Sequence, residues 1–185
     1  MALTPSNMLP LGTEAPDFQL PDVVSGNQVA LDELLEAHGL LVMFICNHCP
    51  YVKHVQEQLV LISNDYQGKG IGIVAISSND VEMYPEDSPD AMREVAKKWQ
   101  FHFPYLFDET QEVAKAYDAA CTPDFYLFNG KKELVYRGQL DDSRPGNEKP
   151  VTGHDLRVAL DDLIAGNPIS ENQIPSVGCN IKWKQ

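Results

Sequence analysis

Residues 40–49 have the sequence Leu-Leu-Val-Met-Phe-Ile-Cys-Asn-His-Cys, and this stretch carries the strongest structural signal in the chain. Its six leading apolar residues predict a strand that is buried on both faces. Apolar residues then recur at intervals of three and four over residues 52–66, as on the inner face of an amphipathic helix. Cys46 and Cys49 therefore lie one helical turn apart, where a buried strand gives way to a helix.

This position predicts that Cys46 is a stabilised thiolate. Unpaired backbone amides and the positive end of the macrodipole favour negative charge at the start of a helix. Both a helix N-terminus and a Cys-x-x-Cys pair lower the pKa of a thiol from about 8.5 into a range of roughly 3.5 to 7.5. We expect Cys46 to be the more exposed and more acidic thiol, with Cys49 protected and able to close a short disulfide with it.

A Cys-x-x-Cys pair is also half of a structural zinc site, which usually needs two further Cys or His ligands at close spacing. Cys121 and Cys179 stand alone in the sequence, and His48 and His54 do not form a recognisable pair of ligands. The sequence thus favours redox use of the thiols, with no metal and no dissociable cofactor. A non-catalytic metal-binding module is the lowest-ranked alternative.

Length, charge and composition limit the other possibilities. With 185 residues, of which 43% are hydrophobic, we expect a single domain over residues 1–185. The net charge of −13 argues against nucleic acid and anionic membranes as partners. Residues 1–12 lack a basic region followed by an apolar core, and no apolar run approaches membrane-spanning length. We therefore expect a cytoplasmic protein whose cysteines are catalytic or free.

The remaining pattern is that of a mixed α/β domain. An N-terminal extension (1–36) and a C-terminal tail (168–185) flank the predicted elements. Strands are predicted over residues 40–45, 71–76, 103–107, 125–128 and 133–137. Helices are predicted over about 50–67, from Ser88-Pro89, around 113–117 and from Thr152 to Gly166. Asn129-Gly130 predicts a type I′ hairpin turn.

Two acidic segments lie between these elements. The run Glu82, Glu86, Asp87 and Asp90 is expected to be a solvated surface loop. Asp141-Asp142 could collect a cation, but too few oxygen ligands are fixed there, so a solvated loop is favoured.

Together, the strand-Cys-x-x-Cys-helix unit, a later Thr-Pro before a hairpin and a closing helix resemble the thioredoxin fold. Residues 12–20 resemble the start of the branch that holds peroxiredoxins and TlpA-like thiol-disulfide oxidoreductases. Residues 46–53, 121–125 and 177–184 are similar to peroxiredoxin-like thioredoxin-family proteins. The resemblance covers nearly the whole chain and implies a central mixed sheet flanked by helices.

The resemblance also implies roles for individual residues. Cys46 matches the attacking thiol, Cys49 the resolving thiol, and Pro123 the proline that is cis in this fold. The loop before that proline faces the Cys-x-x-Cys helix and can pair with an extended substrate segment. This implies that Asn47, Pro50 and Thr122 face the substrate.

His48 is expected to tune the redox couple. A histidine directly before the second cysteine also occurs in strongly oxidising disulfide catalysts, and a stabilised thiolate raises the reduction potential. The protein should then be less reducing than thioredoxin, for which about −270 mV is typical. A solvated imidazole with little effect is the alternative. The sequence departs from thioredoxins in having no buried acid in the strand over 40–45.

The predicted function is therefore thiol-disulfide exchange with a protein or small-molecule disulfide, sustained by a thiol reductant. A peroxiredoxin-like thiol peroxidase is the alternative. In peroxiredoxins, Thr-x-x-Cys occupies this turn, so Cys49 aligns with the peroxide-reactive thiol and Cys46 replaces the threonine.

The other two cysteines are possible auxiliary thiols. Cys121 is expected to be a buried, inert thiol. Two roles stay open for Cys179. It is either an unreactive thiol in a packed tail or an auxiliary resolving thiol. Because the bridge between Cys46 and Cys49 needs no movement of the tail, we expect it to dominate the oxidised protein.

Overall fold

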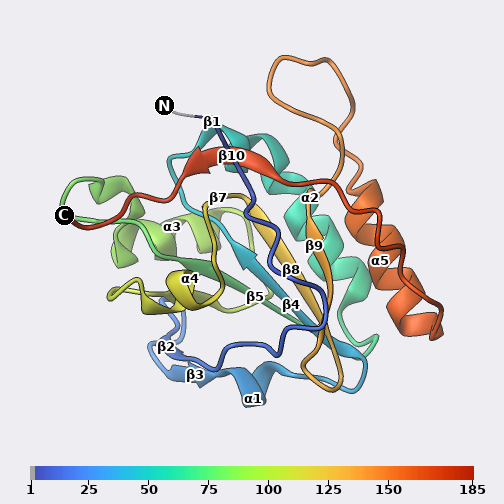
Figure 1. Cartoon of the computed structure of the whole chain (residues 1–185). Coiled ribbons are helices and arrows are strands. Elements are labelled where there is room, and N and C mark those ends of the chain that lie inside the picture. Colours follow the sequence, from blue (N-terminus) through green and yellow to red (C-terminus); the bar gives the residue numbers. More distant parts are fainter. Residues whose placement is uncertain (1–2) are drawn as a thin grey trace.

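A five-stranded mixed sheet forms the centre of the computed structural model, which describes residues 3–185 (Figure 1). Its strand order is β6-β5-β4-β8-β9, with β4 parallel to β5 and antiparallel to β8. The strands are β4 (Gly39–Phe44), β5 (Ile71–Ser77), β6 (Tyr105–Phe107), β8 (Asp124–Asn129) and β9 (Leu134–Gly138). The mixed α/β class predicted from the sequence is confirmed.

The central strand β4 is apolar along its whole length because both faces of the sheet are covered. Leu41 and Met43 belong to one apolar cluster, whereas Leu40, Val42 and Phe44 belong to the other. Successive side chains of a strand point to opposite faces, so a six-residue apolar run serves both clusters.

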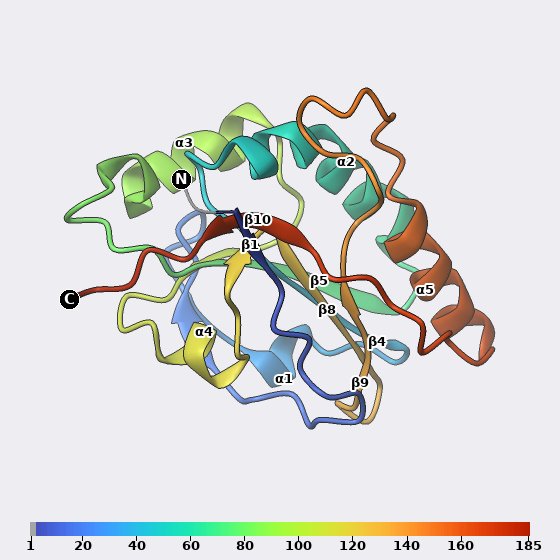
Figure 2. The ribbon, with the colours of Figure 1, turned by 45° about the horizontal axis from the view of Figure 1, so that its top comes forward.

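Helices cover the two faces unequally (Figure 2). The longer helices lie on one face: α2 (Pro50–Tyr66), α3 (Pro89–Lys98) and α5 (His154–Ala165). The short helices α1 (Leu31–Leu34) and α4 (Glu112–Ala116) lie on the other, with the hairpin of β2 (Gln19–Pro21) and β3 (Gln28–Ala30) nearby. No helix among residues 3–185 has the length and apolar character needed to cross a membrane.

The two ends of the chain meet in a second, three-stranded sheet (Figure 1). Strand β10 (Val177–Asn180) lies between β1 (Leu3–Pro5) and β7 (Cys121–Thr122), antiparallel to both. The tail is thus a strand with two hydrogen-bonded neighbours. The division into an extension over 1–36 and a tail over 168–185 stays a prediction about domain organisation.

The turn between β8 and β9 differs from the predicted type I′ turn. That turn needs a positive φ at both central residues, but Lys132 is the residue with a positive φ here (65°), and the Lys132 amide donates to the Asn129 carbonyl. Gly130 is needed for space instead, because a Cβ at this position would lie 2.5 Å from the Ala37 carbonyl oxygen.

Asp141 is not the solvated residue expected from the sequence. Its carboxylate is buried and accepts hydrogen bonds from the Thr152 and Gly153 amides, which precede α5. Ser143 donates to the same carboxylate through its amide and its hydroxyl. These bonds occupy the oxygens that a cation would need, while Asp142 is exposed and pairs with Lys149.

A glycine is required where β10 meets β7. A Cβ on Gly178 would lie 1.9 Å from the Thr122 carbonyl oxygen, a contact that only a shift of the strand could relieve. We predict that Gly178→Ala lowers the free energy of unfolding by about 1–3 kcal/mol, as overpacking typically does. Thermal or urea unfolding measures this, with Gly146→Asn as control, because a Cβ at Gly146 meets no atom within 4 Å and asparagine tolerates its positive φ. Equal stability of the two variants would contradict the prediction.

Candidate active site

The Cys-x-x-Cys segment connects β4 to α2. Cys49 is the N-cap of α2, Pro50 is the first helical residue, and the Cys49 carbonyl accepts from the Val52 and Lys53 amides. Cys46 lies three residues earlier, outside the helix. The two residues are 1% and 0% exposed, so the predicted contrast between a more exposed Cys46 and a protected Cys49 is not found. Strand, loop and helix pack together and bury both sulfurs.

Thr122 contacts both sulfurs. Its hydroxyl lies 3.4 Å from Cys46 Sγ, and its carbonyl oxygen lies 3.4 Å from Cys49 Sγ. The Thr122-Pro123 peptide bond is cis, as the resemblance implied. The loop before Pro123 therefore faces the dithiol, as expected.

The chain's own tail occupies the edge of that loop. Cys179 pairs with Thr122 and Asn180 with Cys121 across β10 and β7, and Thr122 is buried. The prediction that the Thr122 backbone is open to a substrate segment is therefore wrong for this conformation. Antiparallel pairing with β10 already uses that edge.

This pairing brings a third sulfur to the dithiol. Cys179 Sγ lies 2.6 Å from Cys49 Sγ, and the Cys179 side chain is buried. Cys46, Cys49 and Cys179 all belong to the apolar cluster on the α2 face of the sheet. The sequence left the role of Cys179 open, because strand pairing across so many residues has no local signal.

One negative charge on these sulfurs is best placed on Cys49. A hydrogen bond from the Cys46 thiol, helped by one from Cys179 and by the Val52 amide, lowers the pKa of Cys49 to about 5 against the opposing effect of burial. The same hydrogen bond, burial and the charge of Asp87 raise the pKa of Cys46. Burial and the contact with Cys49 raise the pKa of Cys179 to about 12. The expected order of acidity for Cys46 and Cys49 is thus reversed.

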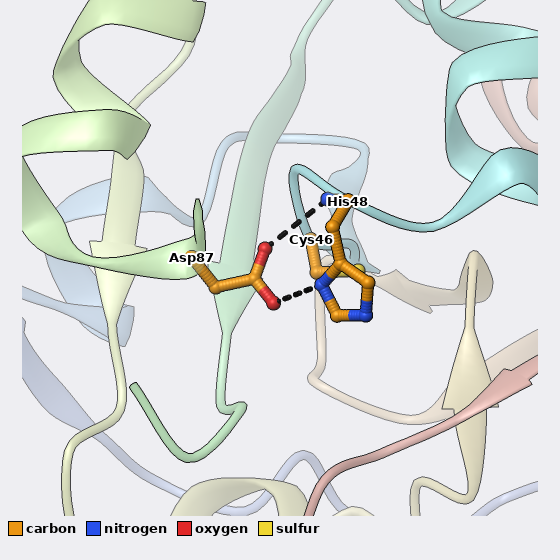
Figure 3. A group of neighbouring side chains, drawn as sticks. All are labelled: Cys46, His48 and Asp87. Atoms are coloured by element: carbon orange, nitrogen blue, oxygen red, sulfur yellow. Dashed lines mark hydrogen bonds and ion pairs between the residues drawn. The ribbon is translucent and has the colours of Figure 1, made fainter. Parts of the chain in front are cut away.

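His48 faces a buried carboxylate instead of solvent (Figure 3). His48 Nδ1 lies 2.5 Å from Asp87 Oδ2, and its ring stacks on Tyr84 with a centroid distance of 5.2 Å. An ionised carboxylate only accepts, so Nδ1 carries the proton. The Nε2 atom is buried with no hydrogen-bond partner in the described part of the chain. A fully solvated imidazole is excluded.

The position of Asp87 differs from the one predicted from the sequence. Expected in a solvated loop, Asp87 ends the 3₁₀ helix η1 (Pro85–Asp87) and is 0% exposed. Its Oδ1 accepts from the Asn47 amide (2.7 Å) and the His48 amide (3.2 Å), and its Oδ2 accepts from Asn79 (2.8 Å) as well as from His48. Asp87 is thus a buried acid that η1 places against the Cys-x-x-Cys loop.

Cys46, His48 and Asp87 place ligand-type atoms within 4.8 Å of one another. Their contacts fit a hydrogen-bonded group better than a metal site. The 2.5 Å separation of His48 Nδ1 and Asp87 Oδ2 is that of a short hydrogen bond, and each Asp87 oxygen already accepts two bonds. The residues therefore do not support the metal-binding alternative.

A chain of contacts connects Asp87 to the tail. Asn79 donates to Asp87 through its side-chain amide and accepts from the Lys182 amide at 2.9 Å. The Lys182 ammonium lies 5.7 Å from the centre of the Tyr84 ring, the ring that stacks on His48. No spacing or composition pattern in the sequence predicts that Asn79, Tyr84 or Lys182 lies near the dithiol.

The other predicted site residues have structural contacts. The Asn47 side chain donates to the Glu86 carbonyl and accepts from the Tyr105 hydroxyl, which fixes it within the loop. Pro50 is exposed at the start of α2, where it can face a substrate. Cys121 is buried as expected, and burial raises the pKa of its thiol.

Residues 11–137 match the model of the AhpC/TSA family. The chain belongs to this family. Among curated proteins, the thiol-disulfide oxidoreductase ResA of Oceanobacillus iheyensis is 28% identical to this AhpC/TSA-family chain over 135 residues. That match covers 70% of this chain and 66% of the ResA protein, just under two thirds of its length.

Solved structures confirm the thioredoxin-like fold of this AhpC/TSA-family protein. A conserved protein from Geobacillus kaustophilus is 59% identical, with a TM-score of 0.98 and coverage of 100% of this chain and 97% of that one. The thioredoxin domain of a thiol-disulfide oxidoreductase from Bacteroides vulgatus has a TM-score of 0.59 at 18% identity, covering 71% and 89% of the two chains. The latter likeness concerns the fold alone.

We predict that the reduced protein shows a thiolate that titrates with an apparent pKa of about 5, and that Cys49→Ser removes it. The cause is hydrogen bonding to Cys49 from Cys46 and Cys179. Ultraviolet thiolate absorbance against pH measures this, with Cys121→Ser as the control that keeps the titration. An acidic titration that survives in Cys49→Ser and disappears in Cys46→Ser would restore the order expected from the sequence.

A second prediction concerns Asp87, whose charge raises the pKa of Cys46. In a Cys49→Ser background, Asp87→Asn should lower the apparent pKa of Cys46, because a nearby negative charge disfavours a thiolate. The pH dependence of alkylation of Cys46 measures the shift. Glu86→Gln is the matched control, since Glu86 is adjacent but exposed. An unchanged Cys46 profile in folded Asp87→Asn protein would contradict the electrostatic role.

Proposed function

We propose that this protein is a dithiol-disulfide oxidoreductase that uses Cys46 and Cys49. The observation that carries the proposal is the position of Cys49 at the N-cap of α2, three residues after Cys46, where the helix amides favour a thiolate. A stabilised thiolate next to a second thiol is what disulfide exchange requires. The match to ResA, named as a thiol-disulfide oxidoreductase, agrees with this reading.

The charge distribution supports Cys49 as the first nucleophile. Its thiolate attacks one sulfur of a substrate disulfide, forms a mixed disulfide and releases the first substrate thiolate. Cys46 then gives its proton to the released substrate thiolate and attacks Cys49 Sγ, which closes the Cys46–Cys49 disulfide and releases the second substrate thiolate. The substrate gains two electrons and the dithiol loses two. A thiol reductant returns the protein to its dithiol form.

His48 and Asp87 act by positioning. The Asp87 carboxylate fixes the Asn47 and His48 amides, and with them the loop that carries Cys46. The Asp87 charge also keeps the proton on Cys46. Stabilising the thiolate of Cys49 stabilises the reduced form, so we propose a reduction potential above the value of about −270 mV typical of thioredoxin.

The proposed substrates are disulfide-containing proteins or small disulfides. A small pocket lined by residues that include Tyr51, Pro123 and Val177 lies beside the cis-proline loop and the start of β10. The net charge of −13 supports a partner other than nucleic acid or an anionic membrane surface. A cytoplasmic location is part of the proposal and rests on the sequence reasoning alone.

Turnover with dithiothreitol and a model protein disulfide tests the function. We expect wild-type protein to exceed the uncatalysed rate and Cys49→Ser to fall to it, whereas Cys121→Ser should retain the wild-type rate. Hydrogen peroxide consumption is measured in parallel, and we expect it to be no faster than that of an ordinary low-pKa thiol. Rapid peroxide turnover that Cys49→Ser abolishes, without disulfide reduction, would replace the proposal with the peroxidase alternative.

A further inference from the structure

We propose that Cys179 is a third redox thiol, which exchanges disulfide bonds with Cys49 inside the folded protein. This inference deepens the proposed function and rests on it for its physiological use. The bond itself, Cys49–Cys179, is a property of the structure that can be tested without any substrate protein.

The first support is the position of the two sulfurs. Cys179 Sγ lies 2.6 Å from Cys49 Sγ, so a bond between them needs no movement of the tail. This overturns the reason for expecting the Cys46–Cys49 bridge to dominate, namely that Cys179 would have to swing into reach. Both sulfurs are buried in the same apolar cluster, where a competing external thiol has little access.

The second support is the element that carries Cys179. Strand β10 is antiparallel to β7, with Cys179 directly opposite Thr122, the residue before the cis-proline. This is the edge at which an extended substrate segment was expected to pair. The tail therefore presents Cys179 to the dithiol as an internal counterpart of a substrate cysteine.

The position of the tail is fixed on both sides of Cys179. Gly178 lets the backbone approach the Thr122 carbonyl, and the Lys182 amide donates to Asn79. The Lys182 carbonyl accepts from the Asp80 amide and from the Gln111 side chain. Several independent contacts thus hold the segment that carries Cys179. The position of Cys179 beside Cys49 is therefore fixed by the fold.

The exchange balances without an outside oxidant. Cys179 loses its proton and its sulfur attacks Cys49 Sγ in the Cys46–Cys49 disulfide. The S–S bond to Cys46 breaks, the Cys49–Cys179 bond forms, and the departing Cys46 thiolate takes up the proton, in keeping with its raised pKa. The same attack on a mixed disulfide at Cys49 releases the substrate as a thiol. One disulfide is present before and after the first reaction, so the protein's oxidation state is unchanged.

The test uses Cys46→Ser, which removes the competing partner of Cys49, and oxidised glutathione as the probe. In this variant Cys49 should first form a mixed disulfide with glutathione, and Cys179 should then attack Cys49 Sγ and release glutathione as a thiol. We expect alkylation and peptide mapping to find a Cys49–Cys179 linkage and a protein lighter by two hydrogen atoms. In Cys46→Ser/Cys179→Ser, the glutathione adduct should persist at least about tenfold longer than in Cys46→Ser. The reason is that Cys179, as an internal thiol, acts at a high effective concentration.

Cys46→Ser/Cys121→Ser is the matched control, since Cys121 is also a buried thiol in the β7–β10 region. It should form the Cys49–Cys179 linkage like Cys46→Ser. A stable glutathione adduct in Cys46→Ser with intact Cys179, or a linkage to Cys121, would overturn the inference. Peptide mapping detects the Cys49–Cys179 disulfide directly, so the test applies even if the wild-type protein reduces no protein disulfide. Failure of the proposed function and failure of this inference are therefore distinguishable.

Discussion

The Asp87 carboxylate is the constraint on which the rest of the site depends. A carboxylate with no exposed surface is costly to bury unless its oxygens are fully hydrogen-bonded, and here four donors from three residues satisfy it. Two of those donors are the Asn47 and His48 amides, so the cost of leaving Asp87 unpaired holds the Cys-x-x-Cys loop in one conformation. A third comes from Asn79, which in turn accepts from Lys182. One buried charge thereby connects the loop, η1 and the tail.

Burial and reactivity oppose each other at the sulfurs. Desolvation raises the pKa of all three thiols, and only Cys49 overcomes it, because hydrogen bonds from Cys46, Cys179 and the Val52 amide lower its pKa. The protein therefore places the thiolate where thiol and amide hydrogens converge and keeps it away from Asp87. A second buried acid, Asp124, directly follows the cis-proline, and burial raises its pKa to about 7 despite hydrogen bonds from Ser6 and Tyr126.

Local patterns in the sequence predicted the strands at β4 and β5, the helix α2, and the Ser88 cap of α3, whose hydroxyl accepts from the Ala91 amide. The family resemblance added the cis-proline and the dithiol. Neither could place Asp87 or Cys179, because their burial results from packing between segments far apart in the chain. Asp87 also lies among exposed acidic residues, so the composition of this segment wrongly predicted a solvated loop. The prediction of a type I′ turn at Asn129-Gly130 was wrong for a related reason. The glycine is needed because of the nearby Ala37 carbonyl and not because of the turn type.

Burial of the three sulfurs also has a kinetic consequence. Because Cys46, Cys49 and Cys179 are only 1%, 0% and 2% exposed, a bulky disulfide meets their sulfurs only after a segment that covers them moves. When closing is faster than reaction, the rate depends on the population of the open form; when substrate is abundant, it levels off at the opening rate. At that limit, different bulky disulfides react at one common rate that belongs to the protein. The opening of the segments that cover the sulfurs then limits the rate of the reaction.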